Sequence, residues 1–201
     1  MIEEHPSMPR YSLAGRVSIG AIAAVVAFAP REAPSREPDI YFVPTPQQAV
    51  DKMLELAGVQ KGSKVYDLGC GDGRIVITAA KKYGARGVGV DIDLVRVKES
   101  RANVAKAKVE KLVTIRHADI FKLDFSDADV VTLYLLPELN VRLMPQLRKL
   151  KPGSRIVSYD FDMQGAKPAQ VYEGVNAGDG STYRIYKWVV PWQPAPVEDG
   201  D

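Results

Sequence analysis

Short apolar runs alternate with amphipathic segments along the middle of the chain. Residues 64–68, 86–91 and 155–159 are apolar runs of strand length, and residues 129–135 form an uninterrupted run typical of a strand buried on both faces. Segments whose apolar positions recur three and four residues apart separate these runs. The alternation predicts βα units, and therefore a mostly parallel sheet covered by helices.

The amphipathic segments have recognisable start and stop signals. Thr45 or Pro46 can begin the first helix, which Gly58 stops, and Asp93 can cap a long basic helix. We expect helices over residues 46–57, 75–83, 94–108 and 138–150, and a further strand over residues 112–116.

The last part of the domain has a hairpin pattern. Residues 169–176 and 182–190 flank the turn sequence Ala-Gly-Asp-Gly-Ser. Five βα units followed by this antiparallel hairpin predict an α/β fold: a doubly wound, seven-stranded, mostly parallel sheet. A ligand is expected at the carboxyl ends of its strands.

The turn after residues 64–68 carries the strongest chemical signal. It reads Asp67-Leu68-Gly69-Cys70-Gly71-Asp72-Gly73-Arg74 and leads straight into a helix, so its glycines can take positive φ and its free N–H groups can face a ligand. A dinucleotide fingerprint needs G-x-G-x-x-G, but Arg74 stands at the third glycine position. The spacing Asp-x-Gly-x-Gly-x-Gly is instead the form that S-adenosylmethionine (SAM) enzymes use. The alternative is a tight turn with a chance cluster of glycines.

Individual side chains around this turn have expected roles. Asp67 and the turn amides can meet the methionine end of SAM. Asp91 closes the next strand, where an acid can accept both ribose hydroxyls. Its alternative role is a helix N-cap, for which Asp93 is the better candidate. Ile92 is either an apolar wall against the adenine or a plain core residue.

Composition narrows the possible chemistry. The chain has 201 residues, of which 46% are hydrophobic and 26% charged, enough for one soluble domain with appendages. A net charge of only +2 gives no electrostatic case for a nucleic-acid partner. Cys70 is the only cysteine, and with two scattered histidines no cluster indicates a metal site. The chemistry must therefore rest on the cofactor.

The N-terminal end differs from the rest. Residues 17–29 form an apolar run that follows two arginines and is shorter than the roughly 20 residues needed to span a bilayer. Residues 1–29 are read as an uncleaved membrane anchor, an export signal, or a helix lying on a membrane or partner. Because SAM is an intracellular cofactor, a location in the cytoplasm or at the cytoplasmic side of a membrane is expected.

The catalytic fold is expected over residues 41–190. Prolines among charges make residues 30–40 an extended linker, and the proline-rich, acidic residues 191–201 are predicted to be a disordered tail.

Longer segments resemble one small group of class I, Rossmann-like methyltransferases. This group comprises a broad-specificity archaeal protein-lysine methyltransferase, its bacterial relatives, and mitochondrial enzymes that modify the ATP synthase c-subunit and the adenine nucleotide translocase. The resemblance covers residues 40–190, and its mitochondrial members also carry an apolar N-terminal segment. The segments that carry it are residues 41–46 (Tyr-Phe-Val-Pro-Thr-Pro), 65–77, 84–91, 130–136 (Val-Val-Thr-Leu-Tyr-Leu-Leu) and 151–162.

The resemblance implies a cofactor site and a protein-lysine substrate, which can be a membrane protein. Asp119 comes after the third strand, where related enzymes meet the adenine amino group, although it can also be a solvated turn acid. The histidine nearby, His117, is read as structural. The implied cofactor-binding residues are Thr45, Asp67, Gly69, Cys70, Gly71, Gly73, Asp91, Ile92, Asp119 and Ile120.

Two residues are catalytic candidates. Tyr134, at the end of the fourth strand, can hydrogen-bond the incoming amine or wall the lysine channel, or be a buried core residue. Asp160 can orient the substrate ammonium or accept its proton, with Asp162 as a weaker candidate, and capping competes with both roles. Thr45 can close a lid over the cofactor or cap a helix. The group more often has histidine where Tyr159 stands, so no role is assigned to that side chain.

Two other functions remain open. One is an RNA or small-molecule methyltransferase, favoured by the basic run between residues 96 and 111, which is otherwise a solvated helix face. The other is a SAM-binding module without catalysis, docked to a complex through its N-terminal helix.

Overall fold

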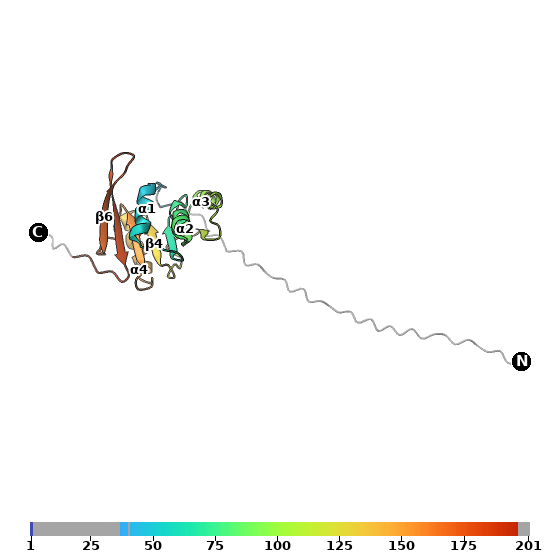
Figure 1. The fold of residues 1–201 in the computed structure, drawn as a ribbon. Coiled ribbons are helices and arrows are strands. Elements are labelled where there is room, and N and C mark those ends of the chain that lie inside the picture. The colour runs from blue at the N-terminus through green and yellow to red at the C-terminus, as the bar shows by residue number, and fades with distance from the viewer. Residues whose placement is uncertain (2–36, 40, 197–201) are drawn as a thin grey trace. The chain divides into compact units, whose positions relative to one another are not determined.

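The computed structural model describes Met1, residues 37–39 and residues 41–196. Seven strands form one sheet in the order β3-β2-β1-β4-β5-β7-β6 (Figure 1). The strands from β1 to β5 are parallel, whereas β7 runs antiparallel to both β5 and β6. Their bounds are β1 Lys64–Leu68, β2 Arg86–Asp91, β3 Val113–His117, β4 Val130–Leu133, β5 Arg155–Tyr159, β6 Gln170–Val175 and β7 Thr182–Val189.

Helices cover both faces of the sheet. Three of them, α1 (Gln47–Leu56), α2 (Arg74–Tyr83) and α3 (Leu94–Ala107), contribute to core clusters on one face, and α4 (Pro137–Leu147) contributes to the cluster on the other. The alternation of side chains along β1 divides the core, because Val65 packs in the α1–α2 cluster and Tyr66 in the α4 cluster. The doubly wound, mostly parallel sheet expected from the sequence is confirmed.

Two connections lack the helix that five complete βα units would require. Residues 118–129 join β3 to β4 through turns, and residues 160–169 join β5 to β6 in the same way. In the first connection the buried ring of Phe125 packs 6.2 Å from the ring of Tyr66. One large aromatic side chain therefore covers sheet surface that a helix would otherwise cover.

The C-terminal segment is ordered further than the sequence indicated. Trp192 is buried in the α4 cluster, and Pro194 forms a β-bridge with Ala166. The amide of Ala195 donates to the carbonyl of Gly165 at 3.0 Å. The expected disordered tail therefore cannot begin at residue 191, and residues 197–201 lie outside the described residues.

The N-terminal predictions concern residues that are mostly outside the described part. The apolar run at residues 17–29 and most of the 30–40 linker fall there. Within the described ranges, no helix has the length and apolar character needed to span a bilayer.

Candidate active site

A pocket opens where the strand order reverses, at the carboxyl ends of β1, β2 and β4. Parallel doubly wound sheets bind ligands at this switch point, because neighbouring connections leave the sheet in opposite directions there. The lining residues that the sequence analysis singled out are Thr45, Asp67, Gly69, Cys70, Asp91, Ile92, Ile120 and Tyr134.

The glycine turn forms one wall of this pocket. Gly69, Gly71 and Gly73 have φ of +82°, +52° and +80°, a region that side chains other than glycine rarely adopt. A Cβ on Gly69 would lie 3.0 Å from Leu135 Cδ2, and one on Gly71 would collide with the ring of Phe42. The turn thus needs glycine both for its conformation and for the close approach of other groups.

Asp91 is held by backbone donors at the end of β2. Its Oδ2 accepts from the amide of Gly71 at 2.9 Å, and its Oδ1 accepts from the amide of Asp93 at 2.9 Å. Burial raises the pKa of Asp91, although these backbone hydrogen bonds act to lower it. Asp93 is the residue that caps α3, through Val95 N at 2.7 Å. Each Asp91 oxygen keeps a second lone pair, which suits a ribose diol.

Asp67 is the most perturbed acid of the site. Its burial raises its pKa to about 7; a hydrogen bond from Thr132 lowers it, and the nearby charges of Asp91 and Asp72 raise it. Thr132 Oγ1 donates to Asp67 Oδ1 at 2.8 Å. A buried carboxyl group that is only partly ionised at neutral pH suits a cationic ligand such as an ammonium group.

Arg74 connects the glycine turn to the segment before α1. Its guanidinium binds Asp72 through two oxygens, with Nη2 to Oδ2 at 2.6 Å, and its Nη1 donates to the carbonyl of Thr45 at 2.8 Å. Thr45 is buried and lines the pocket, while Pro46 is the N-cap of α1 and receives no side-chain cap. Thr45 is therefore a pocket residue and not the helix cap.

Phe42 and Arg96 complete the mouth on the same side. The Phe42 ring lies against Gly71, and the Arg96 guanidinium lies 5.2 Å from the ring centroid. The sequence analysis assigned no role to either side chain. The Tyr-Phe-Val-Pro-Thr-Pro segment was the signal that could have singled out Phe42.

Aromatic rings surround the other side of the pocket. The rings of Tyr134 and Tyr159 meet edge to face at 4.8 Å, and Phe161 stacks 6.1 Å from Tyr134. Burial and then the charge of Asp160 raise the pKa of Tyr134, and burial raises the pKa of Asp160 itself. Asp160 does not line the pocket but follows β5 directly, with φ of +59° and its Oδ1 accepting from Arg184 N at 3.1 Å.

The remaining predicted residues lie nearby with other partners. Asp119 is outside the pocket lining, and its Oδ1 accepts from the amide of Phe121 at 3.0 Å. His117 bonds through Nε2 to the carbonyl of Ile92 at 2.9 Å, in line with a structural role. Cys70 is buried, which raises the pKa of its thiol well above the usual value.

Asn140, in α4, positions the loop that carries Asp160. It is fully buried, and its Nδ2 donates to Ser158 Oγ and to the carbonyls of Phe161 and Asp162 at 3.1–3.3 Å. The sequence analysis missed it, because one polar residue in an amphipathic helix gives no signal of its own.

Replacing Asn140 with Asp is expected to lower the free energy of unfolding by about 2 kcal/mol, since an acceptor would face two carbonyls. Urea unfolding measures the change. Asn176→Asp, at an exposed amide that bonds Ser181 Oγ, is the matched control and should change stability by much less. Equal effects of the two substitutions would contradict the assigned role of Asn140.

Comparisons with known proteins agree with this geometry. Residues 67–170 match the family described as the ANTKMT methyltransferase domain. A protein-lysine N-methyltransferase of Saccharolobus islandicus is 43% identical over 156 residues, which cover 76% of this chain and 95% of that protein. The chain belongs to the ANTKMT methyltransferase family.

Other relatives of this ANTKMT-family chain extend the comparison. The human lysine N-methyltransferase of the ATP synthase C-subunit is 32% identical over 172 residues, covering 82% of this chain and 73% of that protein. A solved structure described as an RNA methyltransferase from Salinibacter ruber, in complex with S-adenosyl-L-homocysteine, is 46% identical. It superposes with a TM-score of 0.69 over 79% of this chain and all of that one.

The ANTKMT-family pocket of this chain has the chemistry that SAM requires. The turn provides a cradle without Cβ atoms, Asp91 offers acceptors for a diol, and Asp67 offers a buried carboxyl group for the ammonium. The chain is therefore a SAM-dependent methyltransferase, whose product is S-adenosylhomocysteine. Within the described ranges, no group of three or more His, Cys, Asp or Glu could hold a metal ion.

Proposed function

We propose that this chain transfers methyl groups to lysine side chains of a protein. The observation that carries the proposal is the aromatic and acidic group formed by Tyr134, Tyr159, Phe161 and Asp160 beside the cofactor pocket. Aromatic faces and a carboxylate attract a protruding ammonium group. The name of the Saccharolobus relative supports the same substrate class.

The chemistry places few demands on these side chains. Bound SAM supplies a methyl group on a sulfonium, which a neutral amine attacks in line. A lysine with a pKa near 10.4 must first lose its proton, and the aromatic surroundings disfavour the charged amine once the mouth excludes water. The Tyr134 hydroxyl can accept a hydrogen bond from the amine, and Asp160, close enough to raise the pKa of Tyr134, can accept the released proton.

Tyr134→Phe tests this arrangement. The substitution keeps the ring contacts with Tyr159 and Phe161 but removes the hydroxyl, so we expect kcat to fall roughly 10- to 100-fold with unchanged affinity for SAM. Steady-state kinetics and calorimetric titration separate the two quantities. Tyr83→Phe, at the end of α2, should leave both unchanged. A Tyr134→Phe enzyme with full kcat would remove the hydroxyl from the mechanism.

An RNA substrate is the second candidate, favoured by two observations. The solved structure from Salinibacter ruber is described as an RNA methyltransferase. In this chain a groove between α2 and α3 is lined by Lys81, Lys82 and Lys106. Against it, Lys82 already pairs with Asp51 at 2.6 Å, and the net charge of the chain is only +2.

The membrane part of the proposal rests on the sequence before the domain. The apolar run at residues 17–29 is proposed to contact a membrane, at the cytoplasmic side, and the substrate is proposed to be a membrane protein. The human relative, whose name refers to ATP synthase, supports a membrane-bound target.

Labelling identifies the substrate class. The full chain is incubated with methyl-labelled SAM and with membrane and soluble extracts, and the products are treated with protease or nuclease and then hydrolysed. Methyl-lysine in protease-sensitive material from the membrane fraction is the expected result. Label confined to nuclease-sensitive material would establish the RNA alternative instead, and label confined to small molecules would overturn both.

A further inference from the structure

Exposed apolar side chains gather around the mouth of the cofactor pocket. Three of them line the pocket itself, Val95 lies between the lining residues Asp93 and Arg96, and Leu136 follows the lining residue Leu135. We call this group the apolar rim: Tyr41, Phe42, Val43, Val95 and Leu136. It contains five of the nine large apolar side chains that are exposed in the described part of the chain.

The rim is assembled from segments far apart in the sequence. Its members come from the segment before α1, from the first turn of α3 and from the loop between β4 and α4. These segments meet because they all follow, or pack over, the carboxyl ends of the parallel strands. Solvent contact is substantial, since Val95 is 61% and Leu136 is 42% exposed. A gathering of this kind around a mouth marks an interaction surface.

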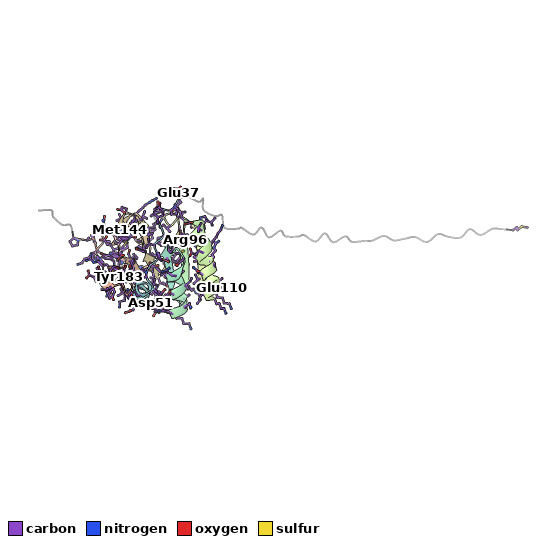
Figure 2. The ribbon with its side chains drawn as sticks, turned by 90° about the horizontal axis from the view of Figure 1, so that it is seen from above. Glu37, Asp51, Arg96, Glu110, Met144 and Tyr183 are labelled. Atoms are coloured by element: carbon purple, nitrogen blue, oxygen red, sulfur yellow. The ribbon has the colours of Figure 1, made fainter. Side chains whose placement is uncertain are left out.

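The sequence before the domain indicates what covers the rim. The apolar run at residues 17–29 follows Arg10 and Arg16, and residues 30–40 connect it to the rim over roughly 40 Å at most when fully extended. Figure 2 shows Glu37 beyond the Arg96 end of α3, away from Glu110 at the other end. The described domain therefore begins at the same end of the molecule as the mouth.

We infer that the apolar rim lies against a phospholipid bilayer, so that the mouth of the cofactor pocket faces the membrane surface. The inference rests on the proposed function, because it specifies that the target lysine is presented at the bilayer interface. The aromatic members Tyr41 and Phe42 are residue types that insert at such interfaces, and the apolar run supplies a second attachment. Two attachments from one end of the domain fix its orientation.

The test compares two single-cysteine positions in the full chain. Leu136→Cys places a polarity-sensitive fluorophore on the rim, and Val171→Cys places it on edge strand β6 at a site of similar exposure, 45%. The natural Cys70 is buried and does not compete for the label. Vesicles of equal parts phosphatidylcholine and phosphatidylglycerol, with and without a spin-labelled lipid as quencher, are then added.

A blue shift and lipid quenching at residue 136, with no change at residue 171, is the expected result. A chain that does not bind the vesicles, or that binds with neither or both labels responding, would overturn the inference. So would a response at residue 136 that needs only a higher protein concentration, because a second copy would then cover the rim. The fluorescence is read without turnover, so it is independent of whether methyl-lysine forms.

Discussion

Asp67→Asn is expected to stabilise the protein without cofactor and to abolish most of its affinity for SAM. The folded pKa of Asp67 is about 7, above the usual value of 3.8, so the folded state binds more protons than the unfolded state between these values. Stability from this group is therefore lost as the pH rises through that window. At pH 8 the buried charge costs about 4 kcal/mol by this relation, and the substitution should recover about 2 to 4 kcal/mol.

The loss of affinity has the same origin with the opposite sign. The carboxylate that is costly alone becomes the partner of a cationic ligand, and removal of one member of such a buried pair costs about 2 to 5 kcal/mol. We expect at least 30-fold weaker binding of S-adenosylhomocysteine at pH 8 by calorimetry. For the unaltered protein, affinity should weaken as the pH falls below about 7, because Asp67 becomes protonated.

Urea unfolding at pH 8 and pH 5 measures the stability change. The gain from Asp67→Asn should shrink at pH 5, where the natural side chain is largely protonated. Asp124→Asn, at an exposed acid that bonds the amide of Ser126, is the control and should change stability by less than about 0.5 kcal/mol. A destabilised Asp67→Asn protein that still binds the ligand tightly would contradict the assignment.

Gly71→Ala is expected to weaken ligand binding by at least about 30-fold. At φ of +52° an alanine costs about 1 to 2 kcal/mol of strain, and its Cβ would collide with the Phe42 ring. The same Cβ would project into the cradle where the turn amides approach the ligand. Calorimetric titration with S-adenosylhomocysteine measures the loss.

A matched glycine separates strain from crowding. Gly180 has φ of +71° in the β6–β7 turn, but a Cβ there meets nothing within 4 Å. Gly180→Ala should therefore lower stability by a similar strain while binding the ligand normally. If Gly180→Ala weakened binding as much as Gly71→Ala, general destabilisation would explain the loss and the cradle would not.

The regular elements were predictable because their signals are local. The bounds of β1, β2 and β5 were predicted to the residue, since each apolar run ends at turn-forming residues. The expected helix 138–150 instead ends at Leu147, two residues after Pro145, which lacks an amide donor. The third strand is shifted by one residue, to Val113–His117.

The errors concern contacts between distant segments. The packing of Trp192 and the bridge of Pro194 to Ala166 depend on a loop far back in the chain, so a proline-rich composition was misleading. The candidate site shows the same division. The acids and glycines of the turn could be identified from their spacing, but the partner of Asp67, Thr132, lies 65 residues away on β4 and only the folded sheet brings them together.

The order of strands also has a consequence for synthesis on the ribosome. The strand made last, β7, is not at the edge of the sheet but is inserted between β5 and β6, and it carries the fully buried Trp188. Until residue 189 has emerged from the exit tunnel, β5 has an unpaired edge beside an open core. Nascent chains of this enzyme thus expose a template for intermolecular pairing almost to the end of translation, and even a short C-terminal truncation would make that exposure permanent.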